Sequence, residues 1–401
     1  MPFGFAQVKI LLQEKMALVK PDSARIAKIK VVGVGGGGGN AVSSMIDSGD
    51  VTGVEFIAVN TDAQVLLANK VPTKLQIGEK ITKGLGVGGN PSLGEQAAEE
   101  STEKLKELMI DTDMVFITAG MGGGTGSGAT PVIAKLAKES GALTVAIVTK
   151  PFAFEGTRRM VVAEEGTEKL NEVVDTLIVI PNQRLMDVID RKMTLLEAFK
   201  VVDSVLGQAV HGIAEIITTP GLVNVDFADV KAIMSSAGTA LLGIGTGVGE
   251  NRAQMAARAA ISSPLLDLSI EGARGVLFNI AGGSDLTMFE VDEAARIISS
   301  AADPDANVIF GAVIRDELVD QVRITVIATG FDQTRARIAQ MSRGTDKPIV
   351  QGVVSEKPKD DEKEDENGER EEYSVGEGDM APEEDVFGEK FEIPAFLRKI
   401  H

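Results

Sequence analysis

Two glycine-rich runs in the first half of the chain each follow a short run of apolar, largely β-branched residues. The glycine runs cover residues 33–40 (GVGGGGGN) and 120–128 (GMGGGTGSG). Almost uninterrupted apolar runs are typical of strands buried on both faces of a parallel sheet, and they occur at 28–34, 54–59, 114–118, 143–148 and 176–180. Helix-like segments lie between them, at 40–48, 93–108, 131–140 and 158–173. This alternation predicts an α/β fold with a doubly wound, mainly parallel sheet.

The second half of the chain begins with a different pattern. From Leu195 to Ile217, apolar residues recur at spacings of three and four, which predicts a long amphipathic central helix ended by Pro220 and Gly221. A second, smaller α/β region should follow, with strands at 240–244, 275–280, 308–313 and 322–328 and helices at 229–236, 252–261 and 291–300. We therefore predict an N-terminal extension at 1–25, a first domain at 26–190, the central helix at 191–221 and a second domain at 222–335.

The end of the chain differs from the rest in composition. Residues 355–390 are dense in Glu, Asp, Lys and Gly and hold few apolar residues, so they cannot offset chain entropy by burial. We expect a disordered linker at 336–390. Large apolar side chains return at 391–401. This tail should either bind a partner or pack back on its own domain, and composition leaves both interpretations open.

Charge and cysteine content exclude several classes of function. The formal net charge of −19 argues against sequence-independent nucleic-acid binding and against adhesion to an anionic membrane. Disulfides and thiolate metal sites are impossible because the chain has no cysteine. No apolar run approaches the roughly 20 residues that span a bilayer, and the N-terminus lacks the layout of a secretory signal. A cytoplasmic protein without direct membrane insertion is expected.

The glycine runs lie where strands should end and helices should begin. A helix N-terminus presents unpaired N–H groups and a partial positive charge, and glycine lets an anion approach that backbone closely. Pro131 should mark the start of the helix after the second run, since proline is favoured at the first helical position. Two such runs at one end of a parallel sheet predict a phosphate-binding site at the carboxyl ends of the strands.

The residues alone leave the phosphate ligand open. Neither run is followed by Gly-Lys-Ser/Thr, so the chain is not a Walker-type NTPase. Residues 33–38 fit the dinucleotide fingerprint, with Asp62 as the acid further on, so a nicotinamide-dependent oxidoreductase is an alternative. A dehydrogenase needs no second glycine run, however, and the two histidines are poor proton donors: His211 should be an exposed helix residue and His401 is terminal. A nucleotide-binding regulator without turnover is a third possibility.

Further motifs are more specific. Residues 122–128 match the signature GGGTG[ST]G of tubulin and FtsZ. Motifs at 60–64 (NTDAQ), 86–91 (GVGGNP), 149–152 (TKPF) and 224–229 (NVDFAD), and the last ten or so residues, are also similar to FtsZ sequences. The chain thus resembles the FtsZ family of tubulin relatives over about residues 26–331 and at its end. The resemblance implies a tubulin/FtsZ-like fold, a GTP-binding domain at 26–190 and a GTPase-activating domain at 222–335.

The resemblance also implies the residues of a GTP/GDP site. Phosphate-binding positions would be Gly36, Gly37, Gly38, Gly39, Asn40, Gly124, Thr125 and Gly126. Glu155 and Arg159 would lie beside the ribose and phosphates, and Asn182, Phe199 and Asp203 around the guanine. Phe199 and Asp203 are four apart on one helix and share a face, where an aromatic ring could stack on the base and a carboxylate could accept from guanine N1–H and the 2-amino group. Taken alone, Phe199 is better explained by core packing, since it also lies on the apolar stripe of the helix.

Two acids at the start of a helix carry the implied hydrolysis. By themselves, Asp226 and Asp229 indicate an N-cap and a first-turn acid. The resemblance implies that they complete the active site of the neighbouring subunit, which would make the chain a GTPase active on head-to-tail polymerisation. Mg²⁺ would be held mainly by the phosphates. The resemblance further implies a cytokinetic scaffold at the mid-cell division ring, whose tail recruits division proteins such as the actin-like membrane tether FtsA.

Overall fold

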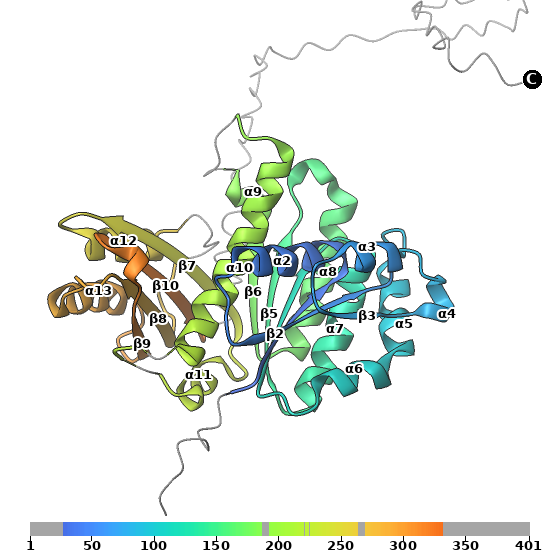
Figure 1. The fold of residues 1–401 in the computed structure, drawn as a ribbon, viewed down its shortest axis with the longest axis horizontal. Helices are drawn as coiled ribbons and strands as arrows, with labels where there is room; N and C mark the ends of the chain where they lie inside the picture. Colours follow the sequence, from blue (N-terminus) through green and yellow to red (C-terminus); the bar gives the residue numbers. More distant parts are fainter. Residues whose placement is uncertain (1–26, 187–191, 220, 224, 264–268, 332–401) are drawn as a thin grey trace, which may run out of the picture. The chain divides into compact units, whose positions relative to one another are not determined.

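The computed structural model describes residues 27–186, 192–219, 221–223, 225–263 and 269–331 (Figure 1). The predicted N-terminal extension, the predicted linker and the predicted tail therefore lie outside the described residues.

Six parallel strands form the first half of one sheet. They are β1 (Ile29–Val34), β2 (Val54–Asn60), β3 (Thr73–Gln76), β4 (Met114–Gly120), β5 (Leu143–Lys150) and β6 (Thr176–Pro181). Their order is β3-β2-β1-β4-β5-β6, and every neighbouring pair is parallel. The chain winds outward in one direction from β1 and then in the other from β4. The predicted doubly wound sheet is confirmed, and the switch point between β1 and β4 is where such sheets bind ligands.

Helices cover both faces of these strands. They are α2 (Gly35–Ser48), α3 (Ala63–Ala68), α4 (Glu79–Thr82), α5 (Pro91–Glu100), α6 (Thr102–Met109), α7 (Gly124–Glu139), α8 (Thr157–Val173) and α9 (Asn182–Leu185). Successive strand residues point to opposite faces, so Val31 joins the core with Met45 of α2, whereas Val32 joins the core with Ile133 of α7. The runs are mostly apolar because both faces are buried along most of their length.

The second domain continues the same sheet. Strand β7 (Gly238–Val248) pairs in parallel with β6 over its first three residues, and the order then runs β7-β10-β8-β9. Strand β10 (Gln321–Thr329) is antiparallel to both β7 and β8 (Gly275–Gly282), and β9 (Asn307–Ile314) is parallel to β8. Helices α12 (Arg252–Ile261) and α13 (Met288–Ala301) pack on this part, while α11 (Phe227–Met234) precedes it. The result is a ten-stranded, mostly parallel sheet.

Helix α10 (Leu195–Thr218) lies between the two parts of the sheet (Figure 1). It begins with a capping box between Thr194 and Glu197. By length and composition α10 could cross a membrane, but most of its apolar residues from Val202 onward belong to the core. His211, predicted to be exposed, is only 8% exposed. That prediction was wrong because α10 is covered by the second domain as well as the first, so it has little solvent face at this turn.

The helices that follow the glycine runs begin earlier than predicted. Helix α2 starts at Gly35 instead of residue 40, and α7 starts at Gly124 instead of Pro131, which lies inside the helix. The glycines thus form the first helical turns. The helix expected at 93–108 is divided at Ser101 into α5 and α6. The short elements β3, α3 and α4 were not predicted.

Candidate functional site

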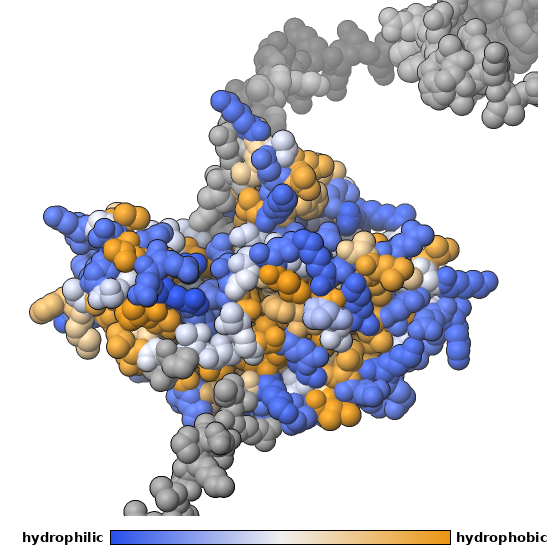
Figure 2. Space-filling model, in the orientation of Figure 1, coloured by the Kyte–Doolittle hydropathy of each residue, from blue (hydrophilic) through white to orange (hydrophobic). Residues whose placement is uncertain are grey.

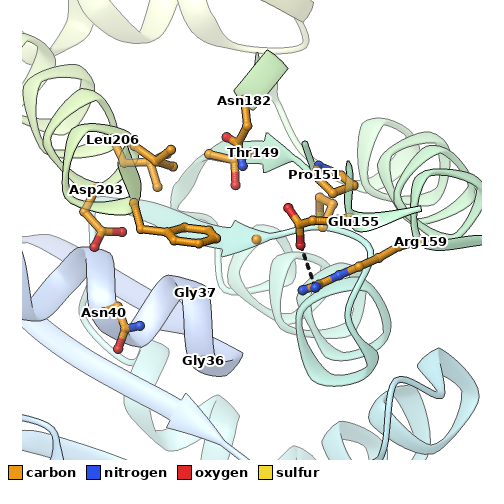
Figure 3. Close-up of a pocket in the computed structure, with 14 residues that line it drawn as sticks. Gly36, Gly37, Asn40, Thr149, Pro151, Glu155, Arg159, Asn182, Asp203 and Leu206 are labelled. Atoms are coloured by element: carbon orange, nitrogen blue, oxygen red, sulfur yellow. Dashed lines mark ion pairs between the residues drawn. The ribbon is translucent and has the colours of Figure 1, made fainter. Parts of the chain in front are cut away.

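A cavity of about 420 Å³ lies at the carboxyl ends of the parallel strands (Figure 3). Its volume is in the range of small-molecule sites. Its walls come from α2, from the ends of β4 and β5, from the segment that leads into α8, from α9 and from α10. The lining residues are Gly36, Gly37, Asn40, Gly120, Met121, Thr149, Pro151, Glu155, Arg159, Asn182, Phe199, Val202, Asp203 and Leu206.

The start of α2 forms one wall of this cavity. Gly35 has a φ of +72°, which favours glycine, and the N-cap residue Val34 makes no side-chain cap. A side-chain Cβ at Gly36 would meet no atom within 4 Å. The first turn therefore presents bare backbone N–H groups to open space, the arrangement that binds an anion at a helix N-terminus. Gly36, Gly37 and Asn40, three of the positions expected to bind phosphate, are exposed there.

The other predicted phosphate-binding residues are buried and do not line the cavity. A Cβ at Gly38 would lie 2.2 Å from the carbonyl oxygen of Thr118, and one at Gly126 would lie 2.4 Å from that of Gly120. These glycines let α2 and α7 approach the strands. Gly39 is buried beside Asn69, whose Nδ2 donates to the Gly39 carbonyl at 2.9 Å.

The second glycine run meets another loop behind the cavity. Gly124 is packed against Val87, since a Cβ there would lie 2.4 Å from the Val87 side chain. The hydroxyls of Thr125 and Thr61 are 3.0 Å apart. Gly123, the N-cap of α7, makes no side-chain cap, so this helix start also presents backbone donors.

Glu155 and Arg159 form an ion pair at the rim. Arg159 Nη1 lies 2.6 Å from Glu155 Oε2, and Glu155 Oε1 accepts from the backbone N–H of Phe152 at 2.9 Å (Figure 3). The Glu155 carboxylate is mostly buried, and the Arg159 side chain is half exposed. The cation is thereby held at the mouth of the cavity, where it can meet an anionic ligand.

The face of α10 that looks into the cavity combines an aromatic ring with a carboxylate. Phe199 is 40% exposed and contacts Phe152 edge-on, with ring centroids 5.7 Å apart. It is therefore accessible for stacking, which disfavours the core-packing alternative. Figure 3 shows Asp203 on α10 facing Asn40 on α2, while Leu206, one turn further along α10, points across the cavity toward Thr149. Burial raises the pKa of Asp203 to about 6.

Asn182 adds an unsatisfied polar atom to the same wall. The residue is 4% exposed, and its Oδ1 has no hydrogen-bond partner among the described residues. Buried amide oxygens are normally paired. A ligand that donates a hydrogen bond, as guanine does, would satisfy this atom.

The predicted catalytic acids lie elsewhere. Asp226 is the N-cap of α11 and accepts from Ala228 N, and Asp229 lies in the first turn, so the capping interpretation is confirmed. Both acids are exposed. The far end of α11 is bound to the first residue of β6, because Thr176 Oγ1 donates to the carbonyl of Met234 at 2.5 Å. Helix α11 therefore lies at the amino ends of the strands, and Figure 1 shows α9 and α11 at opposite ends of α10.

Several lining residues were missed by the sequence analysis. Met121 lies in the second glycine run, and Thr149 and Pro151 lie in the TKPF motif. The motifs were recognised in the sequence, but these three residues were not assigned to the ligand site. Val202 and Leu206 follow the apolar stripe of α10 and were predicted only as part of it. Asp62 does not line the cavity; its side chain caps α3 by accepting from Gln64 N and Val65 N. The site thus lacks the acid that the nicotinamide alternative required.

Comparisons with known proteins agree with this geometry. A family model described as the tubulin/FtsZ family GTPase domain matches residues 28–190, and one described as the FtsZ family C-terminal domain matches residues 238–332. An empty FtsZ dimer from M. jannaschii is 47% identical, with 82% of this chain and 93% of that chain covered and a TM-score of 0.73. A mutant of the same FtsZ is 48% identical, with coverages of 82% and 96% and a TM-score of 0.74. GDP-bound CetZ1 from Haloferax volcanii shares the fold at 21% identity, with coverages of 79% and 99% and a TM-score of 0.67. The chain belongs to the tubulin/FtsZ family of GTP-binding proteins and carries both the GTPase domain and the FtsZ C-terminal domain.

Proposed function

We propose that this chain is a GTPase that polymerises head to tail and hydrolyses GTP at the junction between two copies. One observation carries the proposal: the cavity lies at the carboxyl ends of the strands, while the two exposed acids of α11 lie at the amino ends. A single molecule cannot bring these acids to its own cavity. A second copy, stacked in the same orientation, can.

In this proposal GTP occupies the cavity with its phosphates on the starts of α2 and α7. Gly36, Gly37 and Asn40 contact the phosphates, and Arg159 compensates their charge. The guanine lies against Phe199, with Asp203 and Asn182 accepting from its N–H groups. Adenine lacks the paired N1–H and 2-amino donors, so Asp203 selects guanine.

Mg²⁺ fits this site as a companion of the nucleotide. The described residues contain no group of three His, Asp or Glu side chains that could hold a metal ion by themselves. Mg²⁺ commonly keeps several waters and binds through substrate phosphates. It would neutralise charge on the phosphates of bound GTP.

Hydrolysis requires a water molecule in line with the γ-phosphate. Asp226 and Asp229 are suited to orienting and polarising that water because they are exposed carboxylates fixed on the first turn of a helix. Their N-terminal position on α11 makes them rigid. When a second chain docks, its acids would face the γ-phosphate in the first chain's cavity.

Such a contact joins two different surfaces and does not close on itself, so it generates filaments. Both surfaces expose apolar side chains: Phe154 is 64% exposed beside Glu155, and Leu222 is 72% exposed before α11. Burying them would favour the contact. Figure 2 shows other apolar surface at the left of the molecule, where α13 exposes Met288 and Phe289. Among the relatives, the M. jannaschii FtsZ is described as a dimer and CetZ2 of Haloferax volcanii as a protofilament bound to GTPgS.

The proposal extends to cell division by family membership. The filament would act as the cytoplasmic scaffold of the mid-cell division ring. The tail at 391–401 would bind division proteins, including a membrane tether such as FtsA.

Turnover against protein concentration tests the core of this proposal. GTP hydrolysis per molecule should be near zero in dilute protein and should rise above a threshold at which light scattering also rises. Asp226→Ala should abolish hydrolysis and leave GTP binding to the monomer intact. Full turnover by dilute monomer, or equal loss of binding and hydrolysis in the variant, contradicts hydrolysis at the junction.

A further inference from the structure

A buried carboxylate on α10 has no role in the cavity. Glu215 is 4% exposed and lies twelve residues after Asp203, which places it about 18 Å further along the helix. A buried charge is costly unless it is paired and hydrogen-bonded. The partners of Glu215 therefore indicate what its burial serves.

The side chains that donate hydrogen bonds to the Glu215 carboxylate come from the second domain. Arg315 donates to Oε1 from Nε at 2.8 Å and from Nη2 at 2.6 Å. Asn279 of β8 donates to Oε2 from Nδ2 at 2.9 Å. His211 lies 3.5 Å from Oε2, but burial lowers its pKa, so it is neutral at neutral pH and Arg315 is the cation that pairs with Glu215.

The same strand that leads to Arg315 also holds the segment after α10. Arg315 directly follows β9, and Ala312 lies three residues earlier on that strand. Leu222 N donates to the Ala312 carbonyl at 2.9 Å, and Ala312 N donates to the Val223 carbonyl at 3.2 Å. A Cβ at Gly221 would lie 2.4 Å from the Ala312 oxygen, so only glycine fits this approach.

The segment continues directly to the acids. Val225 is 8% exposed and belongs to the core, and Asp226 follows as the N-cap of α11. The end of α10 is thus held to the residue after β9 by a partly buried ion pair, and Val223, three residues before Asp226, is held to β9 by a short β-bridge.

We propose that the Glu215–Arg315 pair is a positioning device for Asp226 and Asp229. It fixes where α10 ends relative to β9, and so fixes where the following segment presents the two acids to the neighbouring chain. This inference rests on the proposed hydrolysis at the junction. A buried ion pair adds little net stability compared with apolar packing, but it penalises any sliding of α10 that would separate the charges. An apolar contact could slide without such a penalty.

Two variants remove the pair with different costs. Arg315→Met leaves the buried Glu215 carboxyl without its cationic partner, and Glu215→Gln combined with Arg315→Met removes both members of the ion pair while roughly keeping side-chain volume. Both should bind GTP as monomers within about twofold of the unaltered chain, because the cavity is several turns away. Turnover in filaments should fall by about 10- to 100-fold, since misplacement of a catalytic group by about 1 Å has effects of that size.

Mixing experiments separate positioning of the acids from general damage. A Gly36→Glu chain places a carboxylate in the phosphate site and should lose GTP binding, but its acids are intact. In an equal mixture with Arg315→Met or with the double variant, about a quarter of randomly formed junctions join the intact cavity of the pair variant to the correctly placed acids of the Gly36→Glu chain. Turnover should therefore recover above that of either chain alone. Asp226→Ala mixed with Gly36→Glu is the control and should recover likewise.

Each outcome is decisive. If the Asp226→Ala mixture does not recover, hydrolysis at the junction is wrong. If it recovers and neither pair variant does, the pair variants are defective at the cavity or in folding, and positioning of the acids is overturned. Filament turnover of both pair variants at the unaltered rate overturns it as well. Recovery of the double variant, with a thermal unfolding midpoint close to that of the unaltered chain, supports the inference.

Discussion

Replacing Asp203 with Asn should stabilise the nucleotide-free protein while weakening its preference for guanine. Burial raises the pKa of Asp203 from 3.8 to about 6, so the folded chain disfavours the ionised carboxylate that the proposed contact with guanine requires. At 1.36 kcal/mol per pKa unit this difference corresponds to about 3 kcal/mol. The side chain is only partly buried, so solvent screening reduces the expected gain to ~1–2 kcal/mol.

The sign of the pH dependence follows from the same shift. Because the folded-state pKa is raised, the folded chain binds the proton more tightly than the unfolded chain, and Asp203 costs stability once it ionises. Asp203→Asn should match the unaltered chain below about pH 4, exceed it by a margin that grows between about pH 4 and 6, and keep that margin at higher pH. The gain should raise the midpoint of thermal unfolding at neutral pH by about 2–6 °C.

Nucleotide selectivity provides the second measurement. An Asn presents one acceptor and one donor where the carboxylate presents two acceptors. It should lose about 2–3 kcal/mol toward GTP, or ~30- to 150-fold in Kd, and it should fit xanthosine triphosphate, whose C2 carbonyl replaces the 2-amino donor. Glu172→Gln removes an exposed carboxylate on α8 and is the matched control, with no change expected in either measurement. GTP affinity equal to that of the unaltered chain, or a neutral-pH midpoint that does not rise, would refute the assignment of Asp203.

Three further predictions follow from the same contacts. GTP affinity of the unaltered chain should fall as the pH drops below about 6, because the proton that Asp203 takes up competes with guanine. Isothermal titration calorimetry between pH 5 and about 8 measures this affinity, and an affinity that does not change with pH argues against a base-binding carboxylate. Gly38→Ala should destabilise the fold by ~1–3 kcal/mol, since the new Cβ would lie 2.2 Å from a backbone carbonyl oxygen. Gly36→Ala should leave the midpoint of thermal unfolding unchanged, because its Cβ would meet no atom within 4 Å. Equal midpoints for the two variants would contradict this division of roles. Phe154→Asp should raise the threshold concentration for light scattering several-fold. It should leave GTP binding by the monomer intact, because the ring is 64% exposed and lies beside the cavity, not in it. An unchanged threshold would show that Phe154 is not part of the proposed contact.

The sequence predicted most of the parallel strands because their apolar runs are nearly continuous. Val31 and Val32 contribute to cores on opposite faces of the sheet, and this burial on both faces explains why successive strand residues are apolar. The starts of α2 and α7 were missed for an equally physical reason. Glycine has a low helix propensity, so a run of glycines predicts a loop. Tertiary contacts override that preference: Gly38 and Gly126 are the residues that allow the helices to approach the strands.

The candidate site was less accessible to sequence reasoning because its parts are brought together by topology. Spacing alone placed Phe199 and Asp203 on one helical face, but it gave no reason why Val202 and Leu206 of the same apolar stripe should line a cavity. Packing from the second domain, which no local pattern reports, buries His211. The ion pair of Glu215 could not be predicted from any motif. Its partner Arg315 is one hundred residues later in the sequence, and only the fold brings the two side chains together.

The separation of cavity and acids limits what any one molecule of this kind can do. A parallel strand has one carboxyl end, so the cavity at the β1–β4 switch point faces a single direction. Helix α11 is bound at the amino end of β6 through Thr176, so Asp226 and Asp229 face the other direction. Helix α10 spans the distance between them and is itself buried on both sides, which leaves no room for a hinge that could bring the acids back. If this chain hydrolyses GTP with these acids, its enzymatic unit is the contact between two chains, and its activity must depend on concentration.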